Sequence, residues 1–360
     1  MDFSLFYFAN DSRESAGRRY ELLIEGARFA DENGFTAVWT PERHFHPFGG
    51  LYPNPAVTGA AVAAVTKRVQ VRAGSVVSPL HHPLRIAEEW SVVDNLSGGR
   101  AGISFASGWN AADFVLAPEN YHDRRQLVRE QVEQVRRLWR GDTMSLTDGV
   151  GTSRQVAIYP PPVQKQLPVW VTSAGSVDTF RAAGQLGAGV LTHLLGQEPE
   201  DLAVKISAYR QALAEHEDGW AGHVALMVHT FLGDDEAAVK EQVRAPLCDY
   251  LQSSLGLLLG ARYDGARMID PDKLSPDDIA FLTDRAFDRY FHDGGLLGTV
   301  AKAEPIAARF ADIGVDEVAC LIDFGLPTQA VLDGLHHLND LRLRMAGTQT
   351  AKQKATVDKP

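Results

Sequence analysis

Residues 39–46, Trp-Thr-Pro-Glu-Arg-His-Phe-His, bring one carboxylate, one guanidinium and two imidazoles together in a short stretch of chain. Arg43 and His44 occupy the middle of this stretch. An imidazole exchanges protons near neutral pH, and a guanidinium can hold an anionic group in place. The stretch therefore predicts a site of proton transfer, although an ion-paired network without chemistry would use the same residue types.

A second stretch, residues 74–83, begins with Gly74 and Ser75 and contains the pair His81 and His82. Small residues let a flat ligand approach the backbone, although a tight proline-containing loop explains the same pattern. The histidine pair has no third ligand at a metal-binding spacing, so we expect no metal site here.

Two further stretches carry small, hydroxyl and aromatic residues. The first includes Ser104, Ser107, Gly108 and Trp109, which suit the wall of a ligand pocket, although Trp109 could equally be a core residue. The second is Ser173, Ala174, Gly175 and Ser176, just before a predicted helix. The free N–H groups at a helix N-terminus bind phosphate, and a plain N-cap at Ser176 is the competing explanation.

Eight short apolar runs alternate with segments of helical periodicity, the pattern of βα units around a parallel sheet. The runs span residues 3–8, 36–39, 69–75, 101–105, 169–172, 189–192, 224–231 and 317–322. Eight such units predict a closed (βα)8 TIM barrel, whose functional loops follow the carboxyl ends of the strands. Each of the four stretches above follows one of these runs.

A single barrel domain is expected over residues 1–346, with two insertions at its C-terminal face. Residues 141–168 contain Asp148-Gly149 between short β-prone pieces and predict a hairpin, whereas residues 245–298 add mostly helical material. Residues 347–360 are polar and without periodicity, which predicts a disordered tail.

Composition excludes several classes of protein. The formal net charge of −11 disfavours a nucleic-acid partner, because such binding depends on clustered Lys and Arg. We find no apolar stretch long enough to cross a bilayer and no signal peptide, so we expect a cytoplasmic protein without membrane contact. Cys248 and Cys320 lie far apart, which predicts neither a disulfide framework nor a zinc site.

Several of these blocks resemble the bacterial-luciferase-like flavin-dependent monooxygenases. The blocks are WTPERHF, VRAGSVVSPLHHPLRIAEEWSVVDNLSGGR and VWVTSAGS. Four more are similar to the subgroup found in polyketide and nonribosomal-peptide biosynthesis: ISFASGWNAADFVLAPENYHDRR, GVLTHLLGQ, MVHTFLGDD and GVDEVACLIDFG. The resemblance covers residues 2–344. It implies a two-component monooxygenase that receives reduced FMN from a separate flavin reductase. With dioxygen, it would oxidise a natural-product intermediate that is free or tethered to a carrier protein.

The resemblance also implies site residues. Gly74-Ser75 matches a non-prolyl cis peptide in the luciferases, and Ser104 stands where they carry a cysteine beside the flavin. Ser107, Gly108 and Trp109 would complete the ring site. The FMN phosphate would lie against Ser173, Ala174, Gly175 and Ser176, with help from Tyr121 and Arg125.

The catalytic candidates are Arg43, His44, His82 and His193. The luciferase loop reads Glu-His-His-Phe, and its first histidine is credited with proton transfer. Arg43 stands at that place here, so the acid or base is either His44 or His82.

Two alternatives stay open on the same scaffold. One is a deazaflavin-dependent oxidoreductase, which transfers hydride without dioxygen, and the other is a flavin-binding protein without catalysis. The resemblance further implies a homodimer formed through helices beside the second and third strands, where residues 56–65 are apolar.

Overall fold

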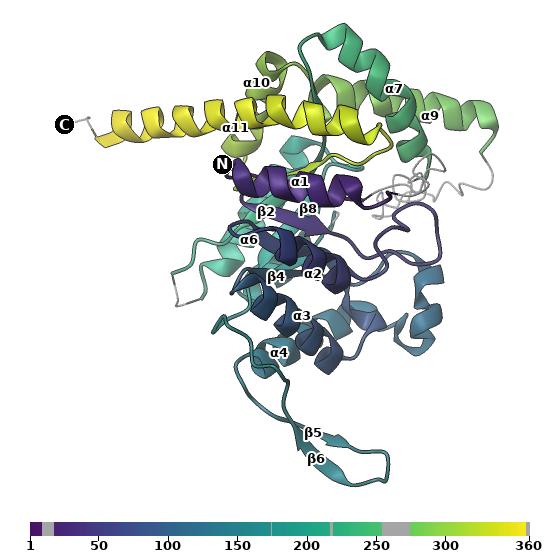
Figure 1. The fold of residues 1–360 in the computed structure, drawn as a ribbon, viewed down its shortest axis with the longest axis vertical. Coiled ribbons are helices and arrows are strands. Elements are labelled where there is room, and N and C mark those ends of the chain that lie inside the picture. The colour runs from purple at the N-terminus through teal and green to yellow at the C-terminus, as the bar shows by residue number, and fades with distance from the viewer. Residues whose placement is uncertain (9–17, 174, 217–218, 254–273, 358–360) are drawn as a thin grey trace.

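Eight parallel strands close into a barrel in the computed structural model, which describes residues 1–8, 18–173, 175–216, 219–253 and 274–357 (Figure 1). The strands are β1 (Asp2–Phe6), β2 (Ala37–Thr40), β3 (Gln70–Val77), β4 (Ala101–Ala106), β7 (Val169–Thr172), β8 (Gly189–His193), β9 (Val224–Leu232) and β11 (Glu317–Leu321). They pair in this order around the ring, and β11 pairs with β1 to close it. The predicted (βα)8 TIM barrel is therefore confirmed.

Helices surround the barrel and cover its outer face. They are α1 (Glu21–Glu32), α2 (Pro55–Val65), α3 (Pro83–Ser97), α4 (Arg124–Trp139), α5 (Val177–Gln185), α6 (Pro199–Leu213), α7 (Glu236–Ser253), α10 (Val300–Asp312) and α11 (Thr328–Val357). Each buries one apolar stripe: in α4, Val128, Val132 and Val135 are buried at helical spacing. The N-terminus of α2 is fixed by Asn54, whose side chain accepts hydrogen bonds from the N–H groups of Ala56 and Val57.

The two long connections differ in character. In the first, β5 (Met144–Thr147) and β6 (Ser153–Val156) form an antiparallel hairpin that projects away from the barrel (Figure 1). The second contains α7, α9 (Pro276–Arg289), a π-helical turn at Tyr290–Gly294 and β10 (Leu296–Gly298). The sequence did not predict β10, because three residues are too few to show a strand pattern; it pairs with the end of β9.

The expected disordered tail is replaced by helix as far as Val357. Residues 347–357 continue α11, and residues 358–360 lie outside the described part of the chain. The segment Ala-Lys-Gln-Lys-Ala consists of strong helix formers, which explains why a polar, aperiodic composition still adopts helical backbone.

None of the helices in the described residues is both long enough and apolar enough to cross a membrane. Cys248 in α7 and Cys320 in β11 are free thiols.

A buried ion pair fills the barrel near the amino ends of its strands. Arg72 donates from Nη1 to Glu317 Oε2 at 2.8 Å, and its guanidinium lies between the rings of Trp39 and Trp170. Burial alone would raise the pKa of the Glu317 carboxyl, but the Arg72 charge and further hydrogen bonds lower it. Ser4 and Trp39 donate to Oε1. The interior is thus closed at this end, and a ligand must use the opposite end, which we call the mouth.

Candidate active site

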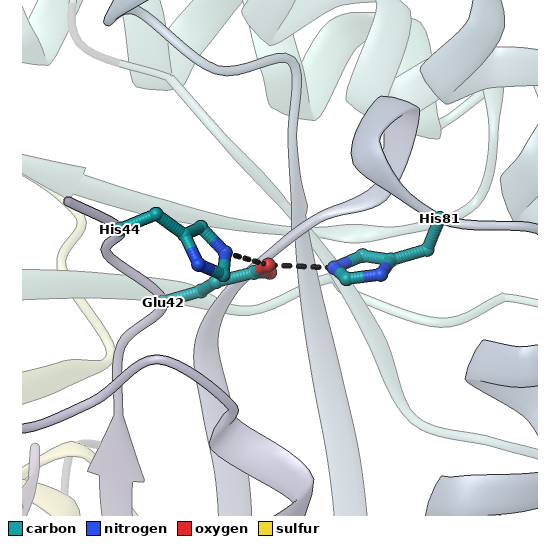
Figure 2. A group of neighbouring side chains, drawn as sticks. All are labelled: Glu42, His44 and His81. Atoms are coloured by element: carbon teal, nitrogen blue, oxygen red, sulfur yellow. Dashed lines mark hydrogen bonds and ion pairs between the residues drawn. The ribbon is translucent and has the colours of Figure 1, made fainter. Parts of the chain in front are cut away.

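A buried carboxylate joins two histidines at the mouth (Figure 2). Glu42 follows β2, and its Oε1 atom lies 2.8 Å from His44 Nε2 and 2.6 Å from His81 Nε2. The other oxygen, Oε2, accepts a hydrogen bond from the Val77 N–H at 2.7 Å, at the end of β3. Because β2 and β3 are adjacent in the barrel, the loops that follow them meet here. Sequence reasoning proposed His44 but missed Glu42 and His81 as site residues.

The cluster favours separated charges. Burial alone would raise the pKa of the Glu42 carboxyl, but the hydrogen bonds from His44 and His81 bring it below its usual value. Burial also acts to lower the pKa of His81, but the Glu42 carboxylate outweighs this effect and raises it. The ionised Glu42 carboxylate therefore stabilises the protonated form of His81. The cluster can hold a proton at the mouth.

The three ligand atoms also lie within 4.8 Å of one another, a spacing that a divalent ion could bridge. This spacing was not predictable from the sequence, because Glu42 and His81 stand 39 residues apart. The nitrogen–oxygen distances of 2.6 Å and 2.8 Å are those of charge-assisted hydrogen bonds. Hydrogen bonding therefore accounts for the close approach of these atoms.

His82 lies outside this cluster. Its exposed ring caps α3, because Nδ1 accepts a hydrogen bond from the Leu84 N–H. Pro83 follows as the first residue of the helix, the usual position for proline. The sequence analysis named His44 and His82 as candidates for the acid or base. Of these two, only His44 lies in the cluster with Glu42 and His81.

Arg43 is buried and committed to an ion pair. Its Nη1 atom lies 2.8 Å and 2.7 Å from the two carboxylate oxygens of Asp113, and its guanidinium lies 4.8 Å from the ring centre of Trp109. Asn110 donates a hydrogen bond to the same carboxylate. Arg43 thus ties the loop after β2 to the loop after β4, and this arrangement favours holding the wall of the mouth over proton transfer.

Three hydroxyls form a row across neighbouring strands. Thr172 Oγ1 lies 2.5 Å from Ser75 Oγ and 2.7 Å from Ser104 Oγ. The peptide bond between Gly74 and Ser75 is cis, as the resemblance implied. Gly74 itself faces the core: a Cβ there would lie 2.6 Å from the ring of Phe6, so packing explains this glycine. The row links β3, β4 and β7, with Ser104 fully buried within it.

The loop after β4 forms part of the rim. Trp109 is 48% exposed, so it is a surface residue and not part of the core. Gly108 has a φ of 76°, and a Cβ there would lie 2.8 Å from Phe114 and 2.9 Å from Val77, so only glycine fits. Ser107 is partly buried beside it. Phe105 is fully buried, and strand alternation places it on the opposite face of β4 from Ser104.

The predicted phosphate loop precedes α5. Ser173 is buried, Gly175 and Ser176 are exposed, and Ala174 lies outside the described residues. Ser176 makes no side-chain hydrogen bond to the helix, so the plain N-cap explanation is not supported. Its hydroxyl and the first N–H groups of α5 are therefore available to an anion.

Tyr121 and Arg125 were expected to help with the phosphate. Tyr121 packs edge-on against Phe114, with ring centres 5.0 Å apart, and the guanidinium of Arg124 lies over its ring. Arg125 is exposed in the first turn of α4. No described contact joins either residue to the loop before α5.

His193 ends β8, four strands away from β2 around the ring, so it lies across the mouth from the Glu42 cluster. Its Nδ1 atom accepts a hydrogen bond from the Leu195 N–H at 3.1 Å. Burial, followed by the charge of Lys205, lowers the pKa of His193 to about 4, so the ring is neutral near pH 7.

Known families and sequences are similar to this chain. A model of the luciferase-like monooxygenase family matches residues 1–317. The chain is 24% identical over 368 residues to the oxygenase component of a flavin-dependent trigonelline monooxygenase from Acinetobacter baylyi, with 99% of each protein covered. It is 29% identical over 215 residues to 4-hydroxyprotoasukamycin monooxygenase from Streptomyces nodosus subsp. asukaensis, with 57% of this chain and 58% of that protein covered.

Solved structures share the barrel. The monooxygenase RslO1 from Streptomyces bottropensis has a TM-score of 0.80 at 22% identity, covering 96% of this chain and all of that one. The oxygenating constituent of 3,6-diketocamphane monooxygenase from Pseudomonas putida, in complex with FMN, has a TM-score of 0.69 at 19% identity, covering 93% and 96%. An F420-dependent secondary alcohol dehydrogenase has a TM-score of 0.68 at 16% identity, covering 94% and 97%. At these identities the likeness shows the fold alone.

Proposed function

The chain belongs to the luciferase-like monooxygenase family, and from this premise we propose that it is the oxygenase component of a two-component flavin monooxygenase. A separate reductase would supply reduced FMN. The observation that carries the proposal is the cluster of Glu42, His44 and His81, which can hold a proton at the mouth. The hydroxyl row of Ser75, Thr172 and Ser104 and the N-terminus of α5 lie at the same end of the barrel. The relative from Acinetobacter baylyi, an oxygenase component, supports the two-component arrangement.

Each part of the mouth has a task in this proposal. Reduced FMN, when bound, would supply the two electrons that reduce one atom of dioxygen to water while the other atom is transferred to the substrate. Ser173, Ser176 and the N-terminus of α5 would hold its phosphate, and the hydroxyls of Ser75 and Ser104 would contact its ring system. The exposed ring of Trp109 would exclude water.

The protein's share of the chemistry is proton transfer. His81 and His44 share the carboxylate oxygen of Glu42 through their Nε2 atoms. Glu42 orients both rings, so that a proton leaving one ring can be replaced through the same cluster. Arg43 and Asp113 would keep the neighbouring wall in place.

Oxygen uptake tests this function against its two rivals. The purified protein is expected to be almost colourless, because it should bind reduced flavin better than oxidised flavin. It should consume dioxygen only with reduced FMN and a reductase. Tight oxidised FMN with direct turnover on NADPH would contradict the two-component arrangement. Anaerobic substrate turnover with a deazaflavin would favour the reductase alternative, and flavin binding without any turnover would favour a non-catalytic protein.

Replacing Ser176 by aspartate is expected to weaken binding of reduced FMN by about ten-fold or more, because two negative charges would share one small site. Gly175→Asp should act in the same way. The fold should survive, since an acidic side chain is acceptable at a helix N-terminus. Anaerobic fluorescence titration measures the affinity, with Ser145→Asp on the exposed hairpin as the matched control. Unchanged affinity in both loop variants would place the phosphate elsewhere.

We further propose a natural-product intermediate as substrate, free or tethered to a carrier protein. The relative named as a 4-hydroxyprotoasukamycin monooxygenase supports this class. An acidic carrier would need a basic surface, and α4 carries five candidate arginines, Arg124, Arg125, Arg129, Arg136 and Arg137. Two of these five arginines bind backbone carbonyls of the protein itself, which leaves fewer candidates for a carrier-binding surface. Arg124 donates to the carbonyls of Gly108 and Tyr121. Arg136 donates to the carbonyls of Leu186 and Gly187.

Arg125→Glu and Arg129→Glu are therefore expected to slow oxidation of a carrier-bound thioester about three- to ten-fold and to leave the free acid unaffected. Both side chains are exposed, so neither change should disturb the fold. Single-turnover rates on free and tethered substrate provide the measurement, with Arg154→Glu on the hairpin as the control. Equal rates on the two substrates in the unmodified protein would indicate a freely diffusing molecule.

A homodimer formed through α2 and α3 remains our proposal for the assembly. Val57, Val92 and Leu96 on these two helices are 66%, 43% and 55% exposed, and a second subunit would cover them. We expect a dimer in sedimentation experiments and a monomer after Leu96→Glu. A monomeric unmodified protein would contradict this proposal.

A further inference from the structure

The cluster of Glu42, His44 and His81 has the composition of a metal site as well as that of a proton-transfer site (Figure 2). The Glu42 oxygen and the two Nε2 atoms lie within 4.8 Å of one another. Two imidazoles and one carboxylate form a ligand set that zinc uses in proteins. In the sequence, His81 and His82 have no third ligand at a metal-binding spacing, but the fold brings Glu42 and His44 to His81.

The carboxylate is already held in the way that a metal ligand requires. Glu42 is 6% exposed, and its Oε2 atom accepts the Val77 N–H, which leaves Oε1 for the two rings. The backbone of His81 is held too, because its carbonyl accepts a hydrogen bond from the side-chain amide of Gln131 at 3.1 Å. Hydrogen bonds of this kind orient the ligands of a metal and raise its affinity.

An ion requires only a small rearrangement of the rings. Two ligand atoms of one tetrahedral zinc ion stand about 3.3 Å apart. Glu42 Oε1 lies 2.6 Å from His81 and 2.8 Å from His44, so both rings must move away from the carboxylate, while the widest of the three separations must shorten. Neither ring is sealed in the core, because the side chains of His44 and His81 are 11% and 27% exposed. An ion from solvent can therefore reach the cluster.

The space beside the cluster suits a fourth ligand. A cavity of about 10 Å³ lies against Glu42 and His81, and Asn54 and Glu89 line its other sides. This is roughly the room that one water molecule needs. Zinc sites with three protein ligands commonly keep a water in the fourth position.

The arginines next to the cluster are neutralised by other carboxylates. Arg43 pairs with Asp113, and Arg85 pairs with Glu89. Glu42 contacts two imidazoles instead, and a metal binds imidazole in its neutral form. The charge of the Glu42 carboxylate would therefore act directly on the ion.

We propose that Glu42 Oε1, His44 Nε2 and His81 Nε2 form a site for zinc or a similar divalent transition-metal ion, and that the bound ion inhibits the enzyme. On binding, the carboxylate and two neutral imidazoles each form one bond to the ion. The Nδ1 atoms keep their protons, and any further proton on the rings passes to solvent. The metal site stands on the geometry, whereas the inhibition rests on the proposed function, in which the same rings transfer protons.

Metal titration of the full-length, flavin-free protein tests the site without turnover. Metal ions are first removed with EDTA and dialysis. Zinc chloride is then titrated by calorimetry, and cobalt chloride is followed by visible absorption, because four-coordinate cobalt absorbs far more strongly than the hydrated ion. We expect one tight zinc ion per chain and an intense cobalt band that zinc abolishes. Absence of a tight zinc site would overturn the proposal.

Two ligand variants locate the ion. His44→Gln and His81→Gln should each weaken zinc binding about 10²-fold or more and remove the cobalt band. His82→Asn is the matched control, because it removes the neighbouring exposed histidine and keeps a side-chain acceptor for the Leu84 N–H. It should bind zinc as the unmodified protein does. Melting curves show which variants fold, and unchanged zinc affinity in either folded ligand variant would overturn the proposal.

Oxygen uptake with a reductase and FMN separates the metal site from the proposed function. Zinc that saturates the tight site should slow uptake about ten-fold or more, and EDTA should restore it. The reductase assayed alone with zinc is the control. Full activity of the zinc-saturated protein would overturn the inhibition and the proton-transfer role of the cluster, whereas the calorimetric and cobalt results would still support the metal site.

Discussion

Glu42→Gln is expected to lower the rate of substrate oxidation about 10²- to 10³-fold and to leave the affinity for reduced FMN within about two-fold. Glutamine has the shape of glutamate but only one acceptor oxygen. It cannot accept from both His44 and His81 at one oxygen and from the Val77 N–H at the other. One donor would then face an amide N–H, and the two rings would lose their common orientation.

The pH profile separates this role from a structural one. The Glu42 charge raises the pKa of His81, so removing the charge should lower that pKa and move the corresponding limb of the profile to lower pH. Glu89→Gln is the control, because Glu89 also lies near His81 but is ion-paired with Arg85 on α3. We expect it to keep the rate near that of the unmodified protein. An unchanged rate in Glu42→Gln would show that this cluster does not transfer protons during the reaction.

Arg72→Met is expected to lower the free energy of unfolding by about 3–5 kcal/mol, because it leaves the Glu317 carboxylate buried without its counter-charge. Methionine also loses the contacts of the guanidinium with Trp39 and Trp170. The difference in unfolding free energy between the variant and the unmodified protein should become smaller at low pH. Protonation of Glu317 removes the negative charge that Arg72 no longer neutralises in the variant. Urea unfolding at two pH values measures both effects.

Two comparisons control this experiment. The double variant Arg72→Met with Glu317→Leu removes both charges and should recover much of the loss. Arg309→Met breaks an ion pair with the exposed Glu200 and should produce little change in the unfolding midpoint. A loss below about 1 kcal/mol in Arg72→Met, or no recovery in the double variant, would show that the ion pair does not hold the barrel interior together.

The barrel could be predicted because its strands carry continuous apolar runs that interrupt helical periodicity. Runs such as 101–105 and 169–172 match the observed strands to within a residue or two at each end. The positions of the functional loops then follow from topology, because the carboxyl ends of parallel strands meet at one face. The sequence alone could not show the centre of the cluster, since Glu42 and His81 stand 39 residues apart and meet only through the pairing of β2 with β3.

Some features around the site had a signal in the sequence. His82 stands immediately before Pro83, and a polar residue before proline at a helix start is typical of a cap, as the structure shows for His82. Phe105 follows Ser104 in a strand, and alternation places the two on opposite faces. The packing of His229 against Tyr250, Tyr290 and Phe324 had no such signal, because it depends on how rings from separate elements meet in three dimensions.

The hairpin of β5 and β6 provides a position at which the protein can be labelled or immobilised. Its tip is solvent-facing: Val150 is 84% exposed, and a side chain added at Gly149 or Gly151 would meet nothing within 4 Å. The hairpin stands away from the barrel (Figure 1). Exposed loop tips accept insertions, so a fluorophore or an affinity peptide placed between Asp148 and Thr152 would report on or immobilise the protein without touching the mouth.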